Sequence, residues 1–156
     1  MNLSDRLRHV YAAVDSPVAL RRSLIMKKTK QFTFALENKP GGLAEVTACL
    51  AKAKLNIVAM SVVDTAEQCL LRVVVDKPAQ LQKLLKDCEC SVVVSDVLLV
   101  ELANQPGSLA KAAERLAKKR VNVDFVYGSG GRGKAKTNVV FGVKNFATAS
   151  KALARL

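Results

Sequence analysis

The feature that most constrains this chain is a stretch that is written twice. Residues 38–60 read NKPGGLAEVTACLAKAKLNIVAM, and residues 104–126 read NQPGSLAKAAERLAKKRVNVDFV. A repeat of this length predicts two copies of one supersecondary unit. An offset of 66 residues aligns Asn38 with Asn104, Pro40 with Pro106, Gly41 with Gly107, Leu43 with Leu109, Leu50 with Leu116, and Asn56 with Asn122.

Each copy predicts a strand, a sharp turn and a helix. Residues 31–36 place apolar side chains at every second position, which is typical of a strand with one buried face. In the Asn-x-Pro-Gly sequence that follows, Pro40 favours a helix start and Gly41 supplies backbone freedom. Apolar residues then recur at helical spacing until Asn56, after which residues 57–64 predict the next strand.

This order of motifs resembles the ACT domain, a small βαββαβ module that binds amino acids and regulates metabolic enzymes. The resemblance covers residues 31–156 and is strongest to the stand-alone tandem form, which consists of two ACT modules and little else. It implies an α+β fold of two tandem ferredoxin-like modules. The interpretation gives three parts, namely a basic N-terminal extension at residues 1–30, a first ACT module at 31–95 and a second at 96–156.

The second module is shorter than the first. In the first, a hairpin, a helix that opens at Pro78 and a strand at residues 91–95 complete the βαββαβ order. In the second, the sequence ends after the helix that corresponds to the one at Pro78, so the last strand is missing. We therefore expect the open sheet edge to be covered by another chain or by the N-terminal extension.

The second hairpin contains a phosphate-loop-like sequence. Residues 128–134 spell G-x-x-x-x-G-K, but Ala135 stands where such loops carry Ser or Thr, and residues 137–141 predict a strand instead of a helix. We interpret this segment as a glycine-rich hairpin tip.

The formal net charge of +12 is unevenly distributed. Residues 1–30 carry seven basic and two acidic side chains, residues 31–96 carry seven and eight, and residues 97–156 carry eleven and three. Two interpretations fit this excess of positive charge. One is a binding surface for nucleic acid or for an acidic partner, and the other is a solvated helix face. We favour the solvated face.

Composition argues against several classes of protein. No apolar run approaches the roughly 18 residues of a membrane span. The four cysteines lack C-x-x-C spacing and read as reduced thiols of a cytoplasmic protein, with Cys49 packed on its helix, and we expect no metal and no cofactor. His9 is the single histidine and lies outside the repeats, so no catalytic triad is available and we expect no enzyme activity.

The turn indicates what the chain binds. Backbone N–H groups at a helix start lack intrahelical partners and lie at the positive end of the helix dipole, where a carboxylate fits. The asparagine amides can donate and accept, which suits the amino and carboxylate groups of a free amino acid. The resemblance implies an effector held between two modules. Carried over by position, the ligand-binding residues are Asn38, Gly41, Gly42, Leu43, Asn56, Ile57, Asn104, Gly107, Ser108, Leu109, Asn122 and Val123.

The same asparagines have a plainer interpretation, in which Asn38 and Asn104 cap helices and Asn56 and Asn122 close them. The identity of the amino acid is not fixed by the sequence. Leu36 and Leu102 stand where serine-responsive members of the family carry a polar side chain, which favours an apolar or aromatic ligand.

Three functions follow as hypotheses. The first is an allosteric amino-acid sensor that forms a homodimer or larger homo-oligomer. The second is the regulatory small subunit of a biosynthetic enzyme, such as acetolactate synthase, and would add a metabolic enzyme as partner. The third is an RNA-binding βαββαβ domain, which is disfavoured because its aromatic pattern is absent and aromatic residues make up only 4% of the chain.

Overall fold

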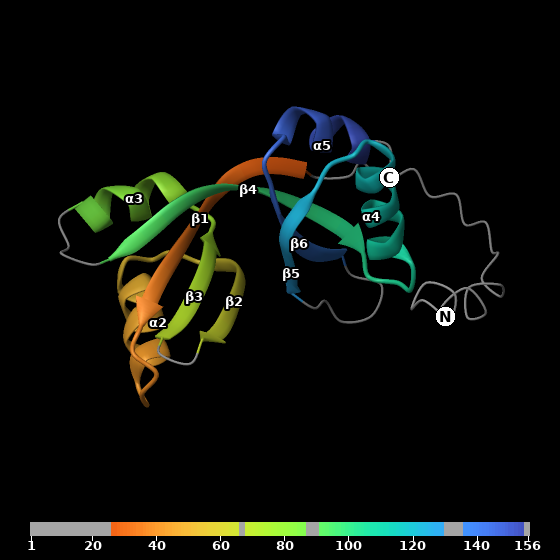
Figure 1. Ribbon diagram of the computed structural model, residues 1–156. Coiled ribbons are helices and arrows are strands. Elements are labelled where there is room, and N and C mark those ends of the chain that lie inside the picture. The colour runs from red at the N-terminus through yellow and green to blue at the C-terminus, as the bar shows by residue number, and fades with distance from the viewer. Residues whose placement is uncertain (1–25, 66–67, 87–90, 130–135, 155–156) are drawn as a thin grey trace.

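The computed structural model describes residues 26–65, 68–86, 91–129 and 136–154 (Figure 1). Over these residues, six strands form one antiparallel sheet in the order β2-β3-β1-β4-β6-β5, with four helices. This confirms the α+β class and the tandem ferredoxin-like modules. In chain order the elements are β1 (Met26–Leu36), α2 (Gly42–Lys52), β2 (Ile57–Thr65), β3 (Gln68–Val75), α3 (Pro78–Lys86), β4 (Val92–Ala103), α4 (Ser108–Lys118), β5 (Val123–Ser129), β6 (Lys136–Val143) and α5 (Phe146–Leu153).

The two modules share their central strands. β4 runs unbroken from Val92 to Ala103, so the boundary expected between residues 95 and 96 falls inside a strand. Its first half ends the sheet of the first module and its second half begins the sheet of the second. No linker separates the modules as a result.

β1 is longer than the sequence predicts. The strand was expected from Gln31, but it begins at Met26 and pairs with β4 from Met26–Val100 to Phe34–Val92. Residues 26–30 therefore lie beside the first strand of the second module, in the place that the last strand of a βαββαβ module takes. The expectation that the N-terminal extension covers this edge is confirmed for these residues.

The pairing register has an internal two-fold pattern. Lys30 pairs with Asp96, and these two residues are also 66 positions apart, so the symmetry axis passes between them. The pair Phe32–Val73 in the first module has its equivalent in Leu98–Phe141 in the second. The repeat seen in the sequence is thus a repeat of strand register.

The helices cover one face of the sheet. Phe32 and Leu98 point to this face, because Phe32 pairs with Val94 and side chains alternate along β4. Under α2 and α3, Phe32 packs with Leu50 and Leu81, and under α4 and α5, Leu98 packs with its own buried cluster. Each helix pair thus buries one core. Figure 1 shows α2 and α3 in one half of the molecule and α4 and α5 in the other.

On the opposite face of the sheet, the two ends of the strand order contact each other. β2 lies close to β5 and β6, although β2 and β5 form opposite edges in the strand order. A third cluster buries Ala59, Val74 and Val140 against Phe125 and Tyr127 at this contact. We call this contact the seam. The seam joins, within one chain, the sheet faces of the two modules that no helix covers.

Some helix positions differ from the prediction. Leu43 is exposed, although it belongs to the apolar residues at helical spacing, and Cys49 is exposed and not packed. Leu84 of α3 is exposed as well. The buried leucines of these helices are Leu50 on α2 and Leu81 on α3. The phosphate-loop-like segment lies mostly outside the described residues, as do Cys88 and Cys90.

Candidate functional site

The first strand-to-helix junction begins where β1 ends. The N–H of Lys39 donates to the carbonyl oxygen of Glu37 at 2.8 Å, which starts the turn. Gly41 then adopts a φ of 103°, a left-handed conformation that glycine accepts without strain, and caps α2. The turn therefore depends on glycine at this position.

Free donors remain at the start of α2. The N–H of Glu45 donates to the carbonyl oxygen of Gly41 at 3.0 Å, which closes the first helical turn. Among the described residues, no acceptor meets the backbone N–H of Gly41, Gly42 or Leu43. These exposed donors at the positive end of the helix are the arrangement that the sequence predicts for a carboxylate.

Asn38 does not cap this helix. Its Nδ2 donates to Oδ1 of Asp64 at 3.3 Å, across to the end of β2. The interpretation of Asn38 as a simple cap is therefore wrong. Asp64 was not predicted as part of the site, since nothing in the repeat aligns a carboxylate with it.

The second junction repeats this geometry with one difference. The N–H of Gln105 donates to the carbonyl oxygen of Ala103 at 2.9 Å, and Gly107 caps α4 with a φ of 86°. The N–H of Ser108, however, donates to the carbonyl oxygen of Gln105 at 3.3 Å. The second junction thus offers one donor fewer than the first. Asn104 and Leu109 are exposed there, as Asn38 and Leu43 are in the first copy.

Asn56 and Asn122 do not close their helices. Left-handed residues do so instead, namely Lys54 and Arg120, each with a φ of 54°. The N–H of the residue after each donates to a carbonyl five positions earlier, Leu55 to Leu50 at 3.0 Å and Val121 to Leu116 at 2.9 Å, as in a Schellman motif. The helix-closing interpretation of the two asparagines is therefore wrong as well.

Asn56 is held by its backbone. Its N–H donates to Oδ1 of Asp76 at 3.0 Å, and its carbonyl oxygen accepts from the N–H of Asp76 at 3.0 Å. The exposed Asn56 side chain remains available, whereas Nδ2 of Asn122 donates to Oδ1 of Asp124 at 2.8 Å. Asp76 was missed from the sequence because the second copy carries Lys144 at the equivalent position.

Ile57 and Val123 follow these asparagines as the first residues of β2 and β5. Both side chains are half-buried and pack against the helix-side cores of their modules. Any contact they make with a ligand would therefore use the backbone more than the side chain.

Within the first module, the structure separates Asn38 from Asn56. Asn38 lies beside Asp64 at the end of β2, whereas Asn56 precedes its beginning, so β2 separates them by roughly 25 Å. The two junctions are also far apart, because β1 and β4 are antiparallel and end at opposite ends of the sheet (Figure 1).

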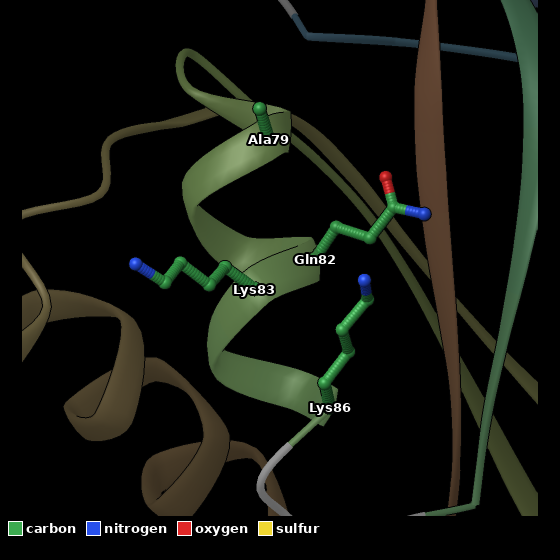
Figure 2. Close-up of a pocket in the computed structure, with 4 residues that line it drawn as sticks. All are labelled: Ala79, Gln82, Lys83 and Lys86. Carbon is green, nitrogen blue, oxygen red and sulfur yellow. The ribbon is translucent and has the colours of Figure 1, made fainter.

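A hollow of about 580 Å³ on α3 is lined by Ala79, Gln82, Lys83 and Lys86, none of which is a predicted site residue. Figure 2 shows Lys83 pointing away from Gln82 and Lys86, so the polar groups of this hollow do not converge on a ligand. One helix supplies all of its lining residues. We do not regard it as a site.

Other kinds of site are absent from the described part of the chain. No group of three or more His, Cys, Asp or Glu side chains there could hold a metal ion. Within the same residues, no helix has the length and apolar character needed to cross a membrane.

Comparison with known proteins places this geometry in a family. A family model described as an ACT domain pair matches residues 27–153. The crystal structure of protein BT0572 from Bacteroides thetaiotaomicron is similar at 32% sequence identity and a TM-score of 0.74, over 83% of this chain and 89% of that one. No curated protein matches the chain.

More distant structures share the fold. The ligand-free regulatory subunit of aspartate kinase from Thermus thermophilus has 12% identity and a TM-score of 0.59, over 86% of this chain and 97% of that one. The corresponding subunit from Thermus flavus has 14% identity and a TM-score of 0.55, over 86% and 96%. The family model covers most of the chain, and the chain therefore belongs to the ACT domain pair family.

Proposed function

We propose that this protein is a non-catalytic, cytoplasmic regulatory protein that binds a free amino acid between ACT modules. The observation that carries the proposal is the first junction, where the amides of Gly41, Gly42 and Leu43 meet no acceptor in the described chain. A ligand carboxylate would accept from these donors, and the amide of Asn38 would contact the same ligand. Membership of the ACT domain pair family supports this role.

A second copy of the chain would complete the site. Asn38 and Asn56 lie at opposite ends of β2, and an antiparallel pairing of β2 with β2 of a second copy would direct Asn38 of one chain toward Asn56 of the other. β2 forms a sheet edge. It also exposes Met60, Val62 and Val63 at 37%, 47% and 38%. An exposed apolar edge strand is the type of surface that pairs with another chain.

The second junction can form an equivalent site with Asn104, Gly107, Ser108, Leu109, Asn122 and Val123. We expect it to bind more weakly, because the N–H of Ser108 and the amide of Asn122 already have partners within the chain. The ligand we favour has an apolar or aromatic side chain, because Leu36 and Leu102 precede the two turns.

A thermal-shift screen against the twenty amino acids tests this function. Ligand at about 100 times its dissociation constant should stabilise the fold by roughly 2.7 kcal/mol. The double variant Asn38→Ala with Asn104→Ala should lose the ligand-induced shift and keep nearly the same midpoint without ligand. If no amino acid shifts the wild-type midpoint, the proposed function is wrong.

A regulatory subunit of a biosynthetic enzyme is the second candidate. It is favoured by the likeness to the Thermus thermophilus regulatory subunit, whose fold this chain shares over 97% of that chain. Copurification with a catalytic chain would separate this candidate from a stand-alone sensor. RNA binding is disfavoured, since the sheet face that an RNA-recognition motif would use is buried at Val74, Val97 and Val140.

A further inference from the structure

A hollow lies between α4 and α5 in the helix layer of the second module. Figure 1 shows these two helices next to each other. The hollow has a volume of about 560 Å³ and is lined by Arg115, Lys118, Lys119, Lys151, Ala152 and Ala154. Four of these side chains are cationic. They come from the neighbouring ends of α4 and α5, whereas a single helix lines the hollow on α3.

The positive charge of this hollow is poorly balanced. Nζ of Lys118 lies 2.7 Å from Oε1 of Glu114, and this contact, with a smaller effect of Arg115, lowers the pKa of Glu114 below its ordinary value. Among the described residues, Arg115, Lys119 and Lys151 form no salt bridge. Among the described residues, one carboxylate therefore lies beside these four cations, and a bound anion would relieve their mutual repulsion.

The equivalent place in the first module is less basic. The repeat aligns Lys118 with Lys52 and Lys151 with Lys83, so these two cations occur in both copies. A single cation in the last turn of α2 already complements the helix dipole there. The other two positions, Arg115 and Lys119, align with Cys49 and Ala53. The additional charge is thus specific to the hollow of the second module.

We propose that this hollow binds the oligophosphate group of a small molecule. Its volume lies in the range of small-ligand pockets, about 300–1,000 Å³. An oligophosphate concentrates several negative charges in such a space, whereas a free amino acid does not. The small side chains of Ala152 and Ala154 offer no anchor for an amphipathic peptide. Aromatic side chains, on which a single-stranded nucleic acid would stack, do not line the hollow.

This site is separate from the amino-acid site. The hollow adjoins the last turn of α4, whereas the second junction lies at its first turn, about 15 Å away along the helix. The proposal therefore does not depend on the proposed function, and either can fail alone.

Calorimetric titration of the full chain with tripolyphosphate and with ATP tests the proposal, at about 0.15 M salt, where exposed charges are screened. We expect saturable binding of one ligand per chain. Arg115→Ala with Lys119→Ala should weaken it at least about tenfold. The control Lys52→Ala with Lys83→Ala removes the same charge from the first module and should leave the affinity unchanged. ATP binding more tightly than tripolyphosphate would identify a nucleotide as the source of the phosphates, and equal affinity would identify the phosphate chain itself.

Three results would overturn the proposal. They are no saturable binding of either probe, an equal loss of affinity in the two double variants, and tighter binding of an acidic peptide or a single-stranded oligonucleotide than of both probes. The thermal unfolding midpoint without ligand should be nearly the same in wild type and in both variants, which reports that the variants are folded.

Discussion

Phe125 lies directly over Gly142 at the seam. A Cβ atom added at Gly142 would lie 2.4 Å from Cε1 of the Phe125 ring, so no larger residue fits without displacing the ring. The first module carries Ala59 and Val74 at the equivalent positions, where the sizes are reversed. The two copies thus diverge in a compensating manner, because the large residue is on β5 in the second module and on β3 in the first.

Gly142→Val should destabilise the fold by about 2 kcal/mol, because the added side chain overpacks a closed contact. Phe125→Ala with Gly142→Val recreates the pair found in the first module. We expect the double variant to recover on the order of 1 kcal/mol relative to the sum of the single changes. Urea unfolding of the four proteins measures this coupling. Additive single effects would mean that the two residues do not constrain each other.

A hydrogen bond from Tyr127 connects the seam to β1. Its hydroxyl donates to Oε1 of the buried Gln31 at 2.9 Å. Tyr127→Phe removes this donor and leaves a buried oxygen without a partner, so we expect a loss of about 1–2 kcal/mol in unfolding free energy. Gln31→Leu in the same background should recover part of that loss, because it removes the stranded oxygen. No recovery would show that the bond matters little.

The same tyrosine should make the fold sensitive to alkali. Burial raises the pKa of Tyr127 above its ordinary value of 10.0, against a weaker opposing effect of Arg72. A raised pKa means that the folded state favours the neutral phenol, so this stability is complete below about pH 10 and is lost as the pH rises above that value. Tyr127→Phe should flatten the pH dependence of the unfolding free energy above about pH 10. An unchanged slope would contradict this.

Asp96 should contribute stability that is lost in acid. Lys30 at 2.8 Å and Lys28 at 2.9 Å lower the pKa of its carboxyl below the ordinary value of 3.8. Its contribution is therefore present above that value and lost as the pH falls through the depressed pKa. At neutral pH we expect Asp96→Asn to cost less than about 1 kcal/mol, since the lysines are solvated. If acid unfolding of the variant begins at the same pH and with the same slope, the pairing has no role.

Self-association should depend on β2. Val62→Lys places a charge on the exposed edge and should convert a dimer to a monomer, measured by analytical ultracentrifugation. Val126→Lys on β5 is the matched control, because Val126 is 45% exposed and Val62 is 47% exposed. Monomers in the wild type, or equal effects of the two changes, would argue against pairing through β2.

Much of the fold is predictable from the repeat, since strand, junction and helix recur with one spacing. The extension of β1 to Met26 was not, because Lys27, Lys28 and Lys30 interrupt any apolar alternation. Backbone pairing with β4 and the ion pairs of Lys28 and Lys30 with Asp96 hold that segment, and of its side chains Met26 packs against the core of the second module. A search for alternating apolar residues does not detect strands that are stabilised in this way.

The candidate site was predicted less completely. The glycine turns follow from local backbone rules, and both turns occur where expected. The partners Asp64 and Asp76 were not predicted, because Asp64 on β2 and Asp76 after β3 are distant in sequence from the asparagines and are not repeated. The separation of Asn38 from Asn56 depends on strand direction, which residue spacing alone does not give.

The most direct test of the account is subunit complementation in a background of Asn104→Ala with Asn122→Ala, which removes the asparagines of the second module. One protein carries Asn38→Ala and the other carries Asn56→Ala, and neither should bind the amino acid alone. If the site forms between two copies, refolding the proteins together should restore sites with both asparagines intact, and calorimetry should detect binding at one site per mixed dimer. If the mixture binds no more amino acid than its parents, the site is not shared between copies, and the central claim fails.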